Sequence, residues 1–191
     1  ERVVSNLSLN LNKNIKKKIL MFGQKSKIDY PYEGELVYLD KNSHTNILNK
    51  IKTIFSRIIK VRGIKRMDKQ ATTISFLEYP NLINTLTSRS GRSIVSVRNH
   101  MSTKHNNGFK SKLWNSTIKY LYPKADLIIS VSEEIKRDLI DNYNVNADKI
   151  KVIYNSYDLQ GIREMAKEEI EDKYSGIFNH PVIITAGRLN K

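Results

Sequence analysis

The chain has 191 residues, of which 39% are hydrophobic and 27% are charged, so it can bury a core and form about one domain. It contains no cysteine, which excludes disulfide frameworks, cysteine-bound zinc, iron–sulfur clusters and thiol catalysis. It has no apolar window of about 18 residues and no signal-peptide pattern at its start, so we expect no membrane-spanning helix.

The charged side chains are unevenly distributed. The 33 basic and 19 acidic residues give a net charge of +14. Residues 1–124 carry 24 basic and 7 acidic side chains, whereas residues 125–191 carry 9 basic and 12 acidic ones. This asymmetry predicts a surface that binds an anion, and phosphates of a nucleic acid, a lipid surface or a nucleotide would each satisfy it.

The first part of the chain contains two short apolar runs and one long amphipathic segment. Residues 17–22 and 35–39 are predicted to be strands. Residues 45–66 are predicted to be a helix, because isoleucines recur there at steps of three and four: Ile47, Ile51, Ile54 and Ile58. We expect this apolar stripe to pack on the sheet.

Strands and helices then alternate regularly. The predicted strands are 72–77, 93–97, 126–131, 149–154 and 181–186. The predicted helices lie between them, the last being a charged helix over about 158–174. Strands separated by helices in this way predict βαβ units and an α/β fold with a doubly wound parallel sheet. In such sheets ligands bind beyond the carboxyl ends of the strands.

Two stretches carry a resemblance to a known family. Residues 125–162 read ADLIISVSEEIKRDLIDNYNVNADKIKVIYNSYDLQGI, and residues 181–191 read PVIITAGRLNK. The first resembles the end of the first domain of family four glycosyltransferases, and the second resembles the start of their second domain. Glu1–Val4, 74–86 and 96–99 are also similar to this family.

The resemblance implies a GT-B architecture, with two Rossmann-like domains facing a cleft. Residues 1–157 would form an acceptor-side domain that lacks its first strand and has an open sheet edge there. Residues 158–180 would be an interdomain linker helix, and 181–191 the first strand of the nucleotide-sugar-binding domain. The chain would then be a fragment, and we expect the fragment alone to be inactive.

The resemblance also implies donor-binding residues. Arg188 follows an apolar strand and a glycine, and the matching arginine of the family helps to hold the donor diphosphate. A guanidinium group offers a rigid fork of donors to phosphate. Asn155, in the crossover between the domains, is either a turn residue or a contact to the nucleotide. No catalytic residue is assigned.

Polar residues after two strands are candidates for acceptor binding. Arg98, Asn99 and His100 follow the strand 93–97, in the loop where the family often has a histidine. Glu78 follows the strand 72–77 and could accept a hydrogen bond from a sugar hydroxyl, although we favour its role as a helix-start carboxylate. Ser132 is predicted to cap a helix.

The basic helix suggests a further partner, an anionic membrane surface. It would be contacted through basic residues of this segment, namely Lys50, Lys52, Arg57, Lys60, Arg62, Lys65 and Arg66. We expect a cytoplasmic protein or one attached to the inner face of the plasma membrane. The four histidines have no metal-site spacing, and no nucleotide-cofactor fingerprint is present, so no metal or cofactor is expected.

The leading prediction is therefore a retaining glycosyltransferase. It would move a sugar from a nucleotide-sugar donor to a saccharide or lipid-linked saccharide, in the synthesis of cell-surface polysaccharide or glycolipid. One alternative is a nucleotide-sugar epimerase of the same fold. Another is a basic nucleic-acid-binding module, which ranks third because the tyrosines are scattered and do not alternate with the basic residues. No nucleic acid is expected as a partner.

Overall fold

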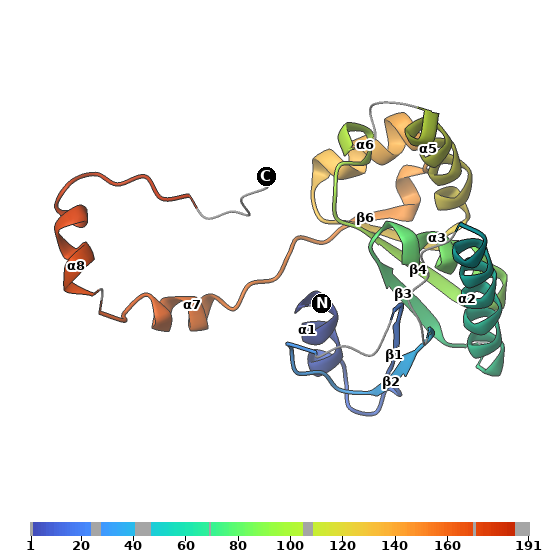
Figure 1. Ribbon diagram of the computed structural model, residues 1–191, viewed down its shortest axis with the longest axis horizontal. Helices are drawn as coiled ribbons and strands as arrows, with labels where there is room; N and C mark the ends of the chain where they lie inside the picture. Colours follow the sequence, from blue (N-terminus) through green and yellow to red (C-terminus); the bar gives the residue numbers. More distant parts are fainter. Residues whose placement is uncertain are drawn as a thin grey trace. The chain divides into compact units, whose positions relative to one another are not determined.

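The computed structural model describes residues 2–23, 28–40, 47–68, 70–104, 109–169 and 171–185. The chain divides into two units, Glu1–Tyr154 and Asn155–Lys191 (Figure 1). The first unit contains both sheets, and the second contains short helices and extended chain.

The main sheet of the first unit has four parallel strands in the order β3-β4-β5-β6. Their bounds are Thr72–Phe76, Arg92–Val97, Leu127–Ser130 and Ile150–Val152. Each strand pairs with the next one in the chain, as expected for successive crossover units. The predicted parallel α/β fold is confirmed.

The helices that connect these strands supply about half of the buried residues of the main core. They are α3 (Glu78–Leu86), α4 (Met101–Lys104), α5 (Phe109–Leu121) and α6 (Glu133–Tyr143). Fully buried residues include Val95, Ile118, Ile128 and Leu139, whereas the neighbouring strand residues Ile94 and Ile129 are only half-buried. Because successive strand residues point to opposite faces, the most deeply buried part of the core lies on one face of the sheet.

A second, two-stranded parallel sheet precedes the main one. Its strands are β1 (Lys18–Met21) and β2 (Glu35–Tyr38), and α1 (Arg2–Asn10) lies before them. A separate small core of Leu39, Val61 and Ile83 joins this sheet to α2 (Ile47–Met67) and α3. Among the described residues, no strand pairs with the outer edge of β1 or with that of β3.

The orientation of α2 differs from the prediction. Ile58, Val61 and Ile64 face the small core. Ile51, Phe55 and Ile59 are instead 46%, 62% and 68% exposed. Two adjacent apolar rows run along this helix at steps of three and four, and only one of them can face the protein. The expectation that Ile51 packs on the sheet is therefore wrong.

The second unit also differs from the prediction in detail. The single helix expected over 158–174 is divided into α7 (Leu159–Met165) and α8 (Asp172–Ser175). Residues 181–185 form no strand, and Ile183 is 95% exposed. A short helix or a lone strand is marginal without a surface to pack on or a strand to pair with. Ala186 and the residues after it lie outside the described part of the chain.

Candidate functional site

The four strands of the main sheet end together. Phe76 pairs with Ser96, Val97 pairs with Ser130, and Ser130 pairs with Val152. Because the strands are parallel, the loops that follow them all leave the same edge of the sheet. This edge brings together the loops that carry Glu78, Arg98–His100 and Ser132, as expected from the order of elements along the chain.

Glu78 is the first residue of α3 and is half-buried. The residue before it, Leu77, has φ 73° and ψ 153°, and its side chain makes no capping hydrogen bond. The negative charge of Glu78 therefore lies in the first turn of a helix, where the backbone dipole favours it. Burial is the main cause that raises the pKa of the Tyr143 hydroxyl to about 12, and the negative charges of Asp138 and Glu78 add to the shift.

The loop after β4 is fixed by a residue that the sequence did not single out. The carboxylate of Asp138 on α6 accepts hydrogen bonds from the backbone nitrogens of Met101 and Ser102, at 2.8 and 3.2 Å. It also lies 3.5 Å from Nδ1 of His100. Asp138 is only 3% exposed, and its other oxygen accepts a hydrogen bond from Asn142 at 2.8 Å.

Hydrogen bonding decides the charge of Asp138. Burial acts to raise the pKa of this carboxyl group, but the hydrogen bonds from Ser102, Asn142 and the Met101 backbone outweigh it, and the pKa is lowered. Asp138 is therefore an anion that holds the His100–Ser102 segment. Its place between the inward-facing residues Ile135 and Leu139 was the sequence signal that could have revealed it.

Ser132 has the predicted capping role. Its hydroxyl oxygen accepts a hydrogen bond from the backbone nitrogen of Ile135 at 3.3 Å, which satisfies one donor of the first turn of α6. The neighbouring Glu134 has a lowered pKa because of hydrogen bonds from its own backbone and from Ser132, with smaller contributions from Arg137 and His100. The start of α6 thus presents a carboxylate near the loop after β4.

The other predicted site residues lie in different parts of the chain. Arg98 and His100 are half-buried, and Asn99 is exposed. Asn155 is exposed and begins the second unit. Arg188 lies outside the described residues. The structure therefore groups the acceptor candidates at one edge, whereas the donor candidates stay predictions.

Several basic residues of α2 bind inward, contrary to the prediction that they face a membrane. Arg57 pairs with Asp40 and lies over the rings of Phe22 and Tyr79, at 5.0 and 5.2 Å from the ring centroids. Lys65 is 3% exposed. Both side chains bind partners inside the protein, and this leaves them unable to contribute to an outer charged surface.

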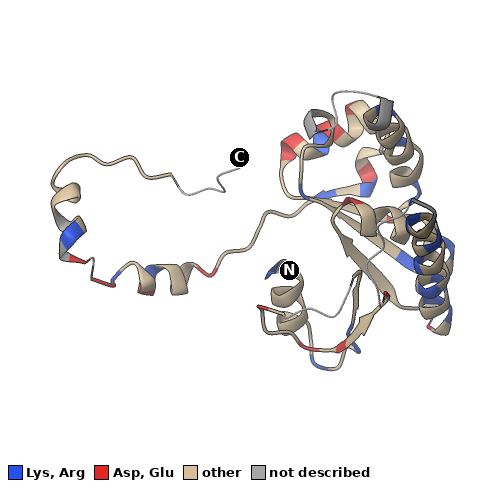
Figure 2. Ribbon diagram, viewed as in Figure 1, with Lys and Arg blue, Asp and Glu red and all other residues tan. Residues whose placement is uncertain are grey.

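The other basic residues of α2 that were predicted to face lipid differ in whether they bind a partner within the protein. Lys60 donates a hydrogen bond to the carbonyl of Leu39 at 2.6 Å. Lys50, Lys52, Arg62 and Arg66 are exposed, and α2 contains no acidic residue (Figure 2). Exposed basic residues are therefore present on α2, but they are fewer than predicted.

Two features are absent from the part of the chain that the structure describes. No three histidine, aspartate or glutamate side chains are grouped so that they could hold a metal ion there. None of the helices described is long and apolar enough to cross a membrane.

A parallel sheet with polar loops at its carboxyl edge is the usual architecture of α/β domains that bind ligands at that edge. Residues 74–160, which include that edge, match the family model described as Glycosyltransferase Family 4. The predicted resemblance to family four glycosyltransferases is thereby confirmed.

Two curated relatives are similar to the chain. One is the N-acetylgalactosamine-N,N'-diacetylbacillosaminyl-diphospho-undecaprenol 4-alpha-N-acetylgalactosaminyltransferase of Campylobacter jejuni. It is 30% identical over 199 residues, which cover 100% of this chain and 52% of the relative. The other is an uncharacterized glycosyltransferase of Methanocaldococcus jannaschii, 26% identical over 92% of this chain and 41% of its own length. The chain thus spans about half the length of these relatives, or less.

A solved structure is also similar. The crystal structure of Anabaena HepE in complex with UDP and glucose aligns with 70% of this chain and 37% of its own chain. The sequence identity is 13% and the TM-score is 0.46.

Proposed function

We propose that the protein is a glycosyltransferase that moves a sugar from a nucleotide-sugar donor to a saccharide or lipid-linked saccharide, with retention of configuration. The observation that carries this proposal is the 30% identity to the Campylobacter transferase along the whole chain. That relative's name describes the transfer of an alpha-N-acetylgalactosaminyl group to a diphospho-undecaprenol-linked sugar. Synthesis of a cell-surface polysaccharide or glycolipid is the corresponding role.

The acceptor sugar would bind at the carboxyl edge of the main sheet. Arg98, Asn99 and His100 lie in the loop that leads to Met101 and Ser102, whose backbone nitrogens donate hydrogen bonds to Asp138 at 2.8 and 3.2 Å, so the end of this loop is held before a ligand arrives. Glu78 leaves the neighbouring strand and could accept a hydrogen bond from a sugar hydroxyl. Catalysis by positioning requires this kind of prearranged polar edge.

The donor would be held by residues of the second unit, with Arg188 on the diphosphate and Asn155 near the nucleotide. A guanidinium group there would stabilise the charge that develops on the departing nucleoside diphosphate. Residues 158–180 would link the two domains, and 181–191 would begin the donor domain. This assignment supports the expectation that the 191-residue chain alone does not turn over a nucleotide sugar.

Attachment to an anionic membrane is part of the proposal. The outward face of α2 combines Ile51, Phe55 and Ile59 with the exposed cations Lys50 and Lys52. Apolar residues beside lysines favour the boundary between lipid headgroups and acyl chains. An enzyme placed there could reach a lipid-linked acceptor.

Transfer of a labelled sugar from a panel of nucleotide sugars to a lipid-linked acceptor tests the function. Full-length protein is expected to form product, the 191-residue chain is not, and Arg188→Ala is expected to lower donor use about tenfold or more, the equivalent of about 1.4 kcal/mol. Arg98→Gln should also weaken transfer, whereas Arg137→Gln, an exposed arginine of α6, is the matched control. No transfer from any donor, together with salt-dependent binding of oligonucleotides, would favour the nucleic-acid-binding alternative.

A further inference from the structure

A pocket of about 580 Å³ lies between the C-terminal half of α2 and the turn that leads from α3 into β4. It is lined by residues of both segments: Arg62, Arg66, Leu86, Thr87, Arg89, Ser90 and Gly91. Gly91 comes directly before β4, whereas Arg98 comes directly after it. The pocket is therefore at the amino edge of the sheet, opposite the edge that carries the acceptor candidates.

The lining of the pocket is strongly basic. The described residues that line it include three arginines and no acidic residue. None of these arginines forms an ion pair with a carboxylate in the described part of the chain. Arg62 donates a long hydrogen bond from Nη2 to the carbonyl oxygen of Leu86 at 3.4 Å. Arginines without a carboxylate partner, two on α2 and one on the turn, give this region a positive potential.

A buried lysine, Lys65, links this part of α2 to the end of α3. The ammonium group of Lys65 donates hydrogen bonds to the backbone and side-chain oxygens of Asn84, at 3.1 and 2.6 Å. This contact holds α2 against the end of α3. Arg62 and Arg66 flank Lys65 on the same helix, so both project beside the turn.

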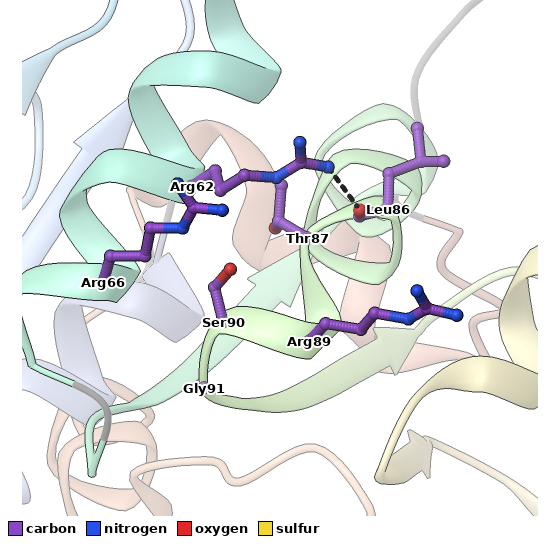
Figure 3. Close-up of a pocket in the computed structure, with 7 residues that line it drawn as sticks. All are labelled: Arg62, Arg66, Leu86, Thr87, Arg89, Ser90 and Gly91. Atoms are coloured by element: carbon purple, nitrogen blue, oxygen red, sulfur yellow. Dashed lines mark hydrogen bonds between the residues drawn. The ribbon is translucent and has the colours of Figure 1, made fainter.

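The turn contributes a polar group to the same space. Figure 3 shows the hydroxyl of Ser90 pointing toward α2, where Arg62 and Arg66 lie, with Arg89 extending away from them. Gly91 has φ 143°, a backbone conformation that a side chain would strain. This glycine allows the chain to turn sharply into β4 and leaves Ser90 facing the helix.

We propose that this pocket binds a phosphate or diphosphate group. Guanidinium groups donate paired hydrogen bonds to phosphate oxygens, and a serine hydroxyl can donate another. The group could belong to a free phosphate compound or to a lipid headgroup, since both present the same oxygens. None of its lining residues is among the donor or acceptor residues proposed above, and binding here does not depend on glycosyl transfer.

Calorimetric titration of the purified protein with pyrophosphate tests the site. The double variant R62Q/R66Q is expected to bind pyrophosphate at least tenfold more weakly than the wild type. The double variant K112Q/K119Q removes the same charge from exposed positions of α5 and is expected to bind as the wild type does. Equal affinity of R62Q/R66Q and the wild type would overturn the proposal.

A residue-resolved measurement guards against a misfolded variant. In an NMR titration of the wild-type protein, pyrophosphate is expected to shift the backbone amide signals of Ser90 and Gly91. Shifts confined to the loops after β3 and β4 would instead show that the anion binds at the opposite edge. Such a result would overturn the proposal whatever the variants do.

Vesicles distinguish the two sources of phosphate. Phosphatidylcholine vesicles with and without phosphatidic acid are mixed with the wild type and with R62Q/R66Q. If the variant loses binding to phosphatidic acid and pyrophosphate competes for it in the wild type, the pocket takes a lipid headgroup. If R62Q/R66Q loses pyrophosphate binding alone, the ligand is a free phosphate compound.

Discussion

The carboxylate of Asp138 accepts a hydrogen bond from the backbone nitrogen of Met101 at 2.8 Å. Asp138 belongs to α6 and Met101 begins α4, and α5 and β5 lie between these two helices in the chain. A charge buried in one helix thus fixes the loop that carries Arg98–His100. The position of the proposed acceptor edge depends on a residue that does not need to touch the sugar.

Asp138→Asn is expected to destabilise the chain by about 1.5–3 kcal/mol, the range for hydrogen bonds to a charged group. The amide keeps the size of the side chain but loses the charge, and it places a donor against other donors. Urea unfolding of the purified chain measures the change. Asp141→Asn, at an exposed position of the same helix, is expected to change stability by less than about 0.5 kcal/mol. Equal effects of the two substitutions would contradict this role.

The contribution of Asp138 should depend on pH. Because its pKa in the folded chain is lowered from the ordinary value of about 4, the stabilisation is complete above that value. It is lost as the pH falls from there through the folded pKa. The stability difference between wild type and Asp138→Asn is therefore expected to be constant from pH 7 to pH 5 and to shrink below about pH 4. Urea unfolding at several pH values checks this, and a difference that grows in acid would be inconsistent with it.

The sequence predicted well those features that depend on local pattern. Alternating apolar runs predicted the parallel strands, and the Ser132 start of α6 followed from the preferences of helix caps. The sequence could not predict which of two apolar rows on α2 faces inward, because that depends on where the β1–β2 sheet lies. Asp138 was missed for the same reason, since the groups it binds are 36 and 37 residues away in the chain.

Lys65 gives a second pH-dependent prediction. Burial lowers the pKa of this ammonium group to about 8, against a smaller opposite effect of the Asp126 charge. The unfolded chain therefore holds more protons at this position between about pH 8 and pH 10, and folding is favoured as the pH rises through that window. The stability of the wild type relative to Lys65→Met is expected to increase there by roughly 2–3 kcal/mol.

Urea unfolding of both proteins at pH 7.5, 9 and 10 measures this difference and cancels the effect of other titrating groups. Lys50→Met, at an exposed position of the same helix, is expected to show no such change relative to wild type. A flat difference for Lys65→Met would mean that Lys65 titrates in the folded chain as it does in water.

The exposed row of α2 can be tested without disturbing the core. Phe55 and Ile59 are 62% and 68% exposed, so the double variant F55S/I59S should fold with nearly unchanged stability. If this row enters a lipid surface, the variant should bind anionic vesicles at least tenfold more weakly, because burial of each apolar side chain in lipid is lost. Leu113→Ser removes a side chain of α5 that is 61% exposed, and it serves as the control in a vesicle sedimentation assay. Unchanged binding by F55S/I59S would exclude this face as the membrane contact.

Leu77 combines an unfavourable backbone with a position directly before Glu78. Its φ of 73° and ψ of 153° lie in a region that glycine alone adopts readily, and such strain costs about 1–3 kcal/mol. The Leu77 side chain is 66% exposed, so little burial is lost when it is removed. Leu77→Gly is therefore expected to raise the stability of the chain by about 1 kcal/mol, after the larger entropy loss of glycine on folding is subtracted.

Leu77→Ala removes the same side chain without relieving the strain, and it should give no such gain in thermal or urea unfolding. In the sugar-transfer assay, Leu77→Gly should be less active than Leu77→Ala if the strained backbone serves to aim Glu78 at the acceptor. Equal stability of the two variants would show that the backbone at Leu77 stores no strain.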